Sequence, residues 1–78
     1  MDFPAYRKLS NNKSFYKITS DTSFEEIQLM GSKAFLYEHN VSKYPEILRI
    51  KEMLELVLAE ILESSEEEYE KLKFDHSL

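Results

Sequence analysis

Hydrophobic and polar positions alternate over the first half of the chain and then change to helical spacing. Four runs rich in aromatic and β-branched residues are separated by short clusters of Asn, Asp, Ser, Thr and Gly, residue types that favour turns. Such runs predict β-strands, and the short connections predict antiparallel neighbours. We expect an antiparallel meander of about four strands, at roughly 5–10, 14–20, 23–30 and 33–40.

The hairpin around Gly31, the only glycine of the chain, organises this meander. A two-residue turn at Gly31-Ser32, with glycine first, pairs Met30 with Lys33 and sets the register of the whole hairpin. Side chains of a strand alternate between the two faces of a sheet. If the register is carried back through a turn at Asp21-Thr22, one face collects Tyr16, Ile18, Ile27, Leu29, Ala34 and Leu36.

Two details of the meander stay open. The turn between the first two strands holds two asparagines, and a two-residue loop there pairs Arg7 with Tyr16, whereas a three-residue loop pairs Lys8 with Tyr16. A capping-box spacing that begins at Ser23 makes a short helix the competitor of the third strand. We favour the strand, because Gly31 and the β-favouring run after it would end such a helix early.

The second half of the chain predicts a long helix that covers this apolar face. Neither Gly nor Pro follows Pro45, which itself suits the first turn of a helix. Apolar residues recur at intervals of three and four, which predicts an amphipathic helix from about 45 to 63. Its stripe consists of Ile47, Ile50, Leu54, Val57 and Ile61. Because Met53, Leu56 and Leu62 lie off this stripe, a shorter helix followed by a strand at 56–62 is the alternative.

A short last helix is expected at about 65–73. Ser64 and Ser65 stand three residues before Glu67 and Glu68, which gives two overlapping capping-box spacings. Tyr69 and Leu72 are its expected contacts with the sheet. The predicted architecture is therefore α+β, with one face of the meander packed by the helix at 45–63.

Length and composition predict one small domain, residues 1–78. A chain of 78 residues buries little more than half of its unfolded surface, so oligomerisation is a common source of added stability. The start of the sequence lacks a basic region followed by an apolar run, so we expect no signal peptide. The longest apolar run, 56–59, is far shorter than the roughly 20 residues of a membrane span. We expect a cytoplasmic protein that does not contact membranes.

The sequence offers no set of residues for catalysis, metal binding or cofactor binding. The chain has no cysteine and only two histidines, His39 and His76, which lie far apart and lack ligand spacing. A single glycine does not build a phosphate-binding loop, and no serine follows the pattern of a nucleophile elbow. We therefore expect a non-catalytic protein without a cofactor.

The face of the sheet opposite the long helix is the main functional prediction. On the registers above it holds aromatic residues and a methionine with no element to cover them, and such patches mark interaction sites. The predicted interaction surface consists of Phe15, Met30, Phe35 and Tyr37, with the off-stripe residues Met53, Leu56 and Leu62 as a second possibility. Two structural explanations compete with it: a bulge that turns an aromatic residue back to the core, or cover by the last helix.

The first hairpin gives the alternative function. Its basic residues, Arg7, Lys8, Lys13 and Lys17, are interleaved with aromatic ones, a pattern that single-stranded nucleic-acid binding uses. The net charge of the chain is −5, and an acidic protein is a poor general binder of nucleic acid. A nucleic-acid partner is therefore the less favoured prediction.

The strings YRKLSNNKSFYKI, FEEIQLMGSK and SEEEYEKLK together resemble a family of short uncharacterised bacterial proteins. The resemblance spans most of the chain, carries no catalytic signature and implies no function. It is compatible with a cytoplasmic protein that forms one domain. From the residues themselves we expect a small protein–protein interaction module that self-associates, most simply as a homodimer, and whose other protein partners the sequence does not name.

Overall fold

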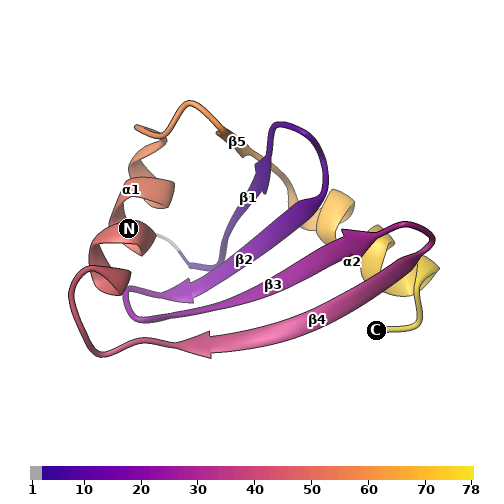
Figure 1. Cartoon of the computed structure of the whole chain (residues 1–78), viewed down its shortest axis with the longest axis horizontal. Coiled ribbons are helices and arrows are strands. Elements are labelled where there is room, and N and C mark those ends of the chain that lie inside the picture. The colour runs from indigo at the N-terminus through magenta and orange to yellow at the C-terminus, as the bar shows by residue number, and fades with distance from the viewer. Residues whose placement is uncertain (1–2) are drawn as a thin grey trace.

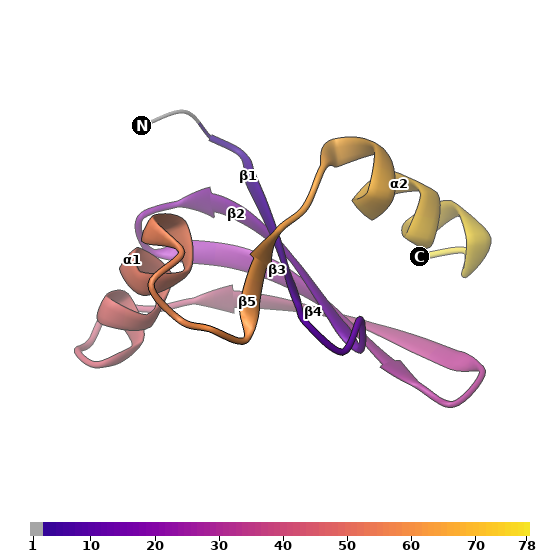
Figure 2. The ribbon, with the colours of Figure 1, turned by 90° about the horizontal axis from the view of Figure 1, so that it is seen from above.

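The computed structural model describes residues 3–78, which form an α+β fold. The elements in chain order are β1 (Ala5–Leu9), β2 (Ser14–Ser20), β3 (Ser23–Met30), β4 (Lys33–Asn40), α1 (Glu46–Glu55), β5 (Ile61–Glu63) and α2 (Glu66–Asp75). The strands form one antiparallel sheet in the order β4-β3-β2-β1-β5, with the helices towards its opposite ends (Figures 1 and 2). The predicted α+β meander is confirmed, and β5 extends it.

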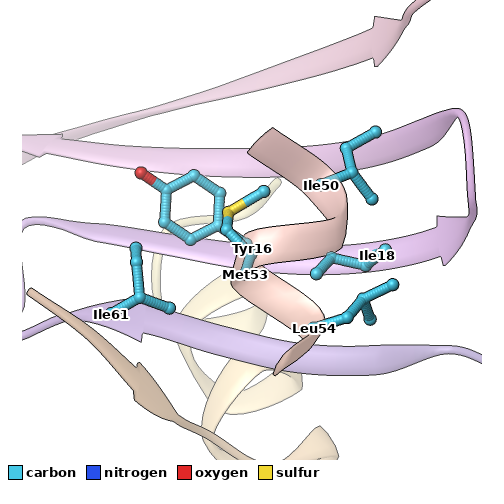
Figure 3. Close-up of a cluster of buried hydrophobic side chains, with 6 residues drawn as sticks. All are labelled: Tyr16, Ile18, Ile50, Met53, Leu54 and Ile61. Carbon is cyan, nitrogen blue, oxygen red and sulfur yellow. The ribbon is translucent and has the colours of Figure 1, made fainter. Parts of the chain in front are cut away.

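The two helices cover opposite faces of the sheet. Neighbouring side chains of β2 show this, since they contact different helices. Tyr16 and Ile18 pack in one cluster with Met53 of α1, whereas Phe15 packs in another with Tyr69 of α2. Since consecutive residues of a strand point to opposite faces, we call the two sides the α1 face and the α2 face. The buried cluster of the α1 face, shown in Figure 3, consists of Tyr16, Ile18, Ile50, Met53, Leu54 and Ile61.

The registers of the β3–β4 and β1–β2 hairpins follow from their turns. Met30 pairs with Lys33, and all further pairs of β3 and β4 are those that a two-residue turn predicts. Gly31 has φ 64°, a backbone conformation that glycine adopts without strain. In the first hairpin Arg7 pairs with Tyr16, which is the two-residue alternative.

The predicted inner face is wrong for β2, and a β-bulge is the reason. Ser20 pairs with Ser23, but the next pair is Ile18 with Phe24, so Thr19 is an extra residue without a partner in β3. One extra residue moves every side chain beyond it to the other face of the sheet. The sequence pattern does not reveal the bulge, because a simple two-residue turn at Asp21-Thr22 satisfies the same alternation.

The bulge divides the predicted apolar face between the two sides of the sheet. Tyr16 and Ile18 lie on the α1 face, while Ile27, Leu29 and Leu36 lie on the α2 face. Each side is then apolar enough to require cover. Two helices on opposite faces meet this requirement, where one helix on one face was expected.

Helix α1 is shorter than the predicted helix from 45 to 63, which is a correction. It ends at Glu55, and Leu56 adopts left-handed backbone at φ 56°. Residues Ile61–Glu63 then pair with β1 as β5. Pairing supplies hydrogen-bond partners for backbone groups of β1 that would otherwise lie at an open edge, and it buries Ile61. The alternative, a shorter helix followed by a strand, is nearer to the structure, although the strand begins later than 56.

The shorter helix also changes which of its residues are buried. Met53, placed off the stripe by the sequence, is fully buried between α1 and the sheet, whereas Val57 of the predicted stripe is 62% exposed. The buried side chains of α1 are Ile50, Met53 and Leu54. A narrow three-residue contact is what a ten-residue helix can present to one face.

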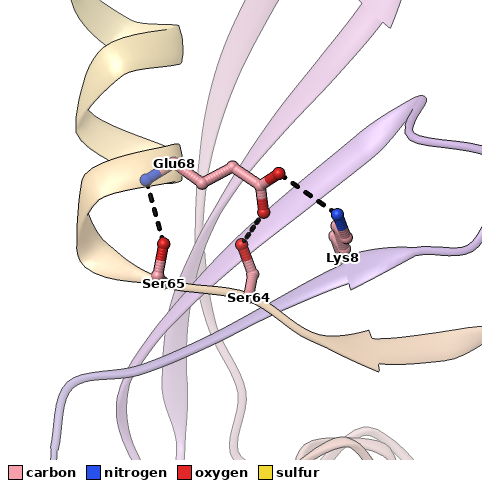
Figure 4. A network of polar contacts seen from close by, with 4 residues as sticks. All are labelled: Lys8, Ser64, Ser65 and Glu68. Carbon is pink, nitrogen blue, oxygen red and sulfur yellow. Dashed lines mark hydrogen bonds and ion pairs between the residues drawn. The ribbon is translucent and has the colours of Figure 1, made fainter.

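Helix α2 begins where its capping residues predict. Ser65 is the N-cap, and its hydroxyl accepts a hydrogen bond from the backbone N–H of Glu68 at 3.1 Å. The hydroxyl of Ser64 donates to the carboxylate of Glu68, which also pairs with Lys8 Nζ at 3.1 Å (Figure 4). The hydrogen bond from Ser64 and the charge of Lys8 lower the pKa of Glu68. Capping thus also ties α2 to β1.

Tyr69 fastens α2 to the sheet. Its side chain is fully buried, and its hydroxyl donates to Glu25 Oε1 of β3 at 3.0 Å. Lys73 Nζ lies 3.9 Å from the same oxygen. Burial raises the pKa of Tyr69 far above its ordinary value, and the negative charge of Glu25 raises it further.

We predict that Tyr69 makes the fold sensitive to alkaline pH. Because its pKa is raised in the folded state, the unfolded chain loses the phenolic proton first as pH rises above the ordinary tyrosine value of 10.0. The free energy of unfolding should therefore be fully present below pH 10 and fall above it. Urea unfolding of the protein at pH 8 and at pH 11 measures this fall.

Tyr69→Phe should show a smaller fall than the wild-type protein over the same pH range, because it has no proton to lose. Tyr44 is 71% exposed, so Tyr44→Phe is the matched control and should behave like the wild type. An alkaline fall of equal size in wild type and Tyr69→Phe would show that Tyr69 is not its source.

Candidate interaction surface

Three of the four residues predicted to form the interaction surface lie together on the outer half of the α1 face. Met30 is 60% exposed, Phe35 40% and Tyr37 41%. The registers of β3 and β4 place all three on one face of the hairpin. We call these three residues the β3–β4 patch. Large apolar side chains gathered on an exposed sheet face are typical of interaction sites.

The patch is uncovered because α1 reaches only part of its face. The core cluster of α1 draws its strand residues from β1, β2 and β5, and on β3 it reaches only Phe24, near the turn at Asp21-Thr22. The bulge at Thr19 turns Tyr16 and Ile18 towards α1, and the helix lies over them. The hairpin of β3 and β4 extends beyond this cover (Figures 1 and 2).

A polar network borders the patch and holds its neighbours in place. His39 Nε2 lies 3.2 Å from Glu26 Oε1, and Gln28 Nε2 donates to Glu26 Oε2 at 3.1 Å. The ring of His39 stacks on that of Phe24 with centroids 4.6 Å apart. Because these side chains satisfy one another, they stand as an ordered polar rim beside the apolar residues. An apolar centre with a polar rim is the usual anatomy of a protein–protein interface.

The β3–β4 patch also lies beside an open edge of the sheet. β4 is the last strand of the sheet order, so among the described strands it pairs with β3 alone. A strand edge presents unpaired backbone N–H and C=O groups that another strand can bind. The sequence contains this signal, since the fourth strand of a simple meander is always at an edge.

Phe15 does not belong to this surface, and its prediction is wrong. Its side chain is 6% exposed and packs against Ile27 and Tyr69 on the α2 face. The bulge at Thr19 puts Phe15 opposite Ile27, and α2 then covers both. Of the second set of predicted residues, Met53 is buried as well. Leu56 and Leu62 are exposed at 40% and 41%.

The four basic residues of the first hairpin do not share one face. Arg7 pairs with Tyr16 and Lys8 with Phe15, so their side chains leave β1 on opposite sides. Lys17 lies opposite Glu25 on the α2 face, and Lys13 lies in the exposed turn. A groove that follows a nucleic-acid backbone needs such charges on one surface.

Arg7 has a structural role that the sequence did not indicate. Its Nε donates to the carbonyl of Met53 at 2.9 Å and its Nη2 to that of Leu54 at 3.0 Å, while Nη1 donates to Tyr6 O at 2.7 Å. The last carbonyls of a helix have no partner within it, and a positive charge is favourable there. Arg7 thus joins β1 to the C-terminal end of α1.

Metal binding, membrane spanning and cavities each bear on the function of residues 3–78. Among residues 3–78, no three His, Cys, Asp or Glu side chains lie together as a metal-binding set. No helix in this part of the chain is long and apolar enough to cross a membrane. A hollow of about 390 Å³ beside α1, between Asp21 and Leu54, is lined mainly by apolar side chains of the helix and is open to solvent.

No family model matches the chain, and comparisons with curated proteins and with solved structures find no significant match. The resemblance to short bacterial proteins stays a prediction. Function is therefore inferred from the surface of the molecule itself.

We predict that Arg7 is more important for stability than for binding. Arg7→Ala removes charge-assisted hydrogen bonds to two helix carbonyls and should lower the free energy of unfolding by about 1.5–3 kcal/mol. Lys13→Ala, an equal loss of charge in the exposed turn of the same hairpin, should change it by less than about 0.5 kcal/mol. Urea unfolding followed by circular dichroism compares the two variants. Equal stabilities for both would contradict the role given to Arg7.

Proposed function

We propose that this chain is a small non-catalytic protein–protein interaction module that self-associates through the β3–β4 patch and acts in the cytoplasm. The observation that carries the proposal is the exposure of Met30, Phe35 and Tyr37 on a single face of an edge hairpin. Interface centres are enriched in aromatic residues and methionine.

Self-association would also add stability to a fold that is small and has no disulfide. A chain of 78 residues without cysteine has two small buried clusters and no disulfide to stabilise it. Any partner that binds the folded state adds to its stability by mass action. A second copy is always present wherever the protein is, so self-association supplies this stabilisation without another gene product.

No observation favours single-stranded nucleic acid as a partner in place of protein. Arg7 contacts helix carbonyls, and Lys8 is paired with Glu68. Both are half-buried, and releasing either charge for a phosphate would break contacts that hold a helix. The interaction module is therefore the function that the geometry supports best.

We expect the wild-type protein to approach the mass of a dimer at high micromolar concentration in sedimentation equilibrium. Phe35→Ser should weaken this association by at least about tenfold, because an aromatic side chain is lost from both copies of the patch. Phe74 is 85% exposed on α2, so Phe74→Ser makes the same substitution away from the patch and should associate like the wild type.

A monomeric mass at every concentration would overturn the proposed self-association. Equal weakening by Phe35→Ser and Phe74→Ser would overturn the assignment of the β3–β4 patch, since general surface hydrophobicity would then explain the association.

A further inference from the structure

The two edges of the sheet are built differently. The β5 edge is three residues long, whereas the β4 edge has eight residues in unbroken register with β3. Proteins protect exposed edges with short strands, prolines, bulges or lysines along the strand. β4 has no proline, no bulge and a single lysine, Lys33, at its first position. It is open to pairing, whereas β5 is too short to pair well.

The turn at Gly31 decides which backbone groups of β4 point outwards. In a hairpin closed by a two-residue turn, the pair beside the turn is hydrogen-bonded, and such pairs alternate along the strands. Met30 and Lys33 form that pair. The N–H and C=O groups directed away from β3 therefore belong to Ala34, Leu36, Glu38 and Asn40.

Symmetry limits how a second copy can pair with this edge. A twofold axis perpendicular to the sheet keeps each face on its own side, so residues opposite each other must lie on the same face. The axis, which lies between the two copies of β4, must therefore be level with one residue that faces its own copy, and not level with the midpoint between two consecutive residues. The four positions that keep five or more residues of β4 paired are Phe35, Leu36, Tyr37 and Glu38. An axis at Glu38 places a glutamate opposite its own copy, which is unfavourable.

The side chains favour the axis at Leu36. There Phe35 lies opposite the partner's Tyr37 twice, once on each side of the axis, and Leu36 lies opposite its own copy. Aromatic cross-strand pairs are among the favourable ones in sheets. An axis at Tyr37 instead places Leu36 opposite a glutamate, and an axis at Phe35 places Tyr37 opposite Lys33.

Resting on the proposed self-association, we infer that a second copy of this chain pairs with β4 edge to edge, antiparallel, about a twofold axis at Leu36. The two five-stranded sheets form one continuous sheet. Both α1 helices lie on one side of it and both α2 helices on the other. The Phe35–Tyr37 pairs lie at the centre of the α1 face of the dimer.

The size of this surface predicts a weak dimer. The accessible surface of 5175 Å² over 78 residues averages about 66 Å² per residue. Met30 and the eight residues of β4 thus expose about 600 Å² on all their sides, and edge pairing covers only part of this, which is less than the roughly 800 Å² per partner of a typical specific interface. Association therefore depends on concentration, and most of its specificity comes from register.

Cysteine cross-linking tests the register directly, because the chain has no cysteine of its own. With the axis at Leu36, Ala34 faces the partner's Glu38 in a hydrogen-bonded pair, whose Cα separation of about 5.5 Å a disulfide can bridge. An equal mixture of Ala34→Cys and Glu38→Cys should form a mixed disulfide dimer on mild oxidation. Each variant alone should form several-fold less, since identical positions lie about 13 Å apart along the strand.

The remaining outcomes separate this inference from the proposed function. A mixture of Glu38→Cys with Lys13→Cys, a turn position at another part of the sheet, measures cross-linking by random collision. If the wild type is a dimer by mass but the Ala34–Glu38 mixture does not exceed this control, the edge pairing is overturned while self-association stands. If the wild type is monomeric, both are overturned.

A proline at the edge provides a second test that does not depend on disulfides. The N–H of Glu38 points outwards, so Glu38→Pro removes a donor from the open edge and none from the β3–β4 pairs. It should weaken dimerisation by about tenfold, with Glu38→Ala as the matched control and circular dichroism to verify the fold. Equal dimerisation of the two variants would overturn the edge pairing.

Discussion

Burial of β2 on both faces is the constraint on which the rest of this fold depends. β2 is the central strand of the five, and Phe15, Tyr16 and Ile18 are all buried although they point to opposite sides. Alternation along the strand points them to opposite sides. A single extra residue, Thr19, decides which side chains of β3 each joins, so that Phe15 lies beside Ile27 and Tyr16 beside Glu26. With apolar side chains on both faces, a chain of this size needs two helices to exclude water.

Polar contacts then determine where each helix lies. Arg7 leaves the sheet on the α1 face and binds the last carbonyls of α1. On the other face the buried hydroxyl of Tyr69 donates to Glu25 of β3, and Glu68 pairs with Lys8. Each of these interactions connects residues far apart in sequence, so each fixes a tertiary arrangement and not only a local one.

The proposed function follows from what these helices leave uncovered. Helix α2 and its cluster cover the other face as far as Ala34 and Leu36 of β4. On the α1 face, helix α1 covers β1, β2 and the start of β3, and the far half of the β3–β4 hairpin extends past it with Met30, Phe35 and Tyr37 exposed. An apolar patch beside an open strand edge combines side-chain contacts with backbone hydrogen bonds for a partner. The residues that carry the proposal are thus the ones that the fold does not use for its own core.

The sequence by itself determined the features that depend on near neighbours. Gly31 fixed the turn and the register of β3 and β4, and Ser65 fixed the start of α2, because positive φ and helix capping are local requirements. That register also placed Met30, Phe35 and Tyr37 on one face, but the expectation that this face lies opposite the long helix was wrong, since α1 packs on the same face and leaves the three residues uncovered only because it is short. Only the tertiary structure decided which side chains of β3 share a face with those of β2, where α1 ends, and that Arg7 binds helix carbonyls. These features depend on a bulge, on strand pairing and on helix carbonyls supplied by distant segments, and alternation along one strand holds no information about them.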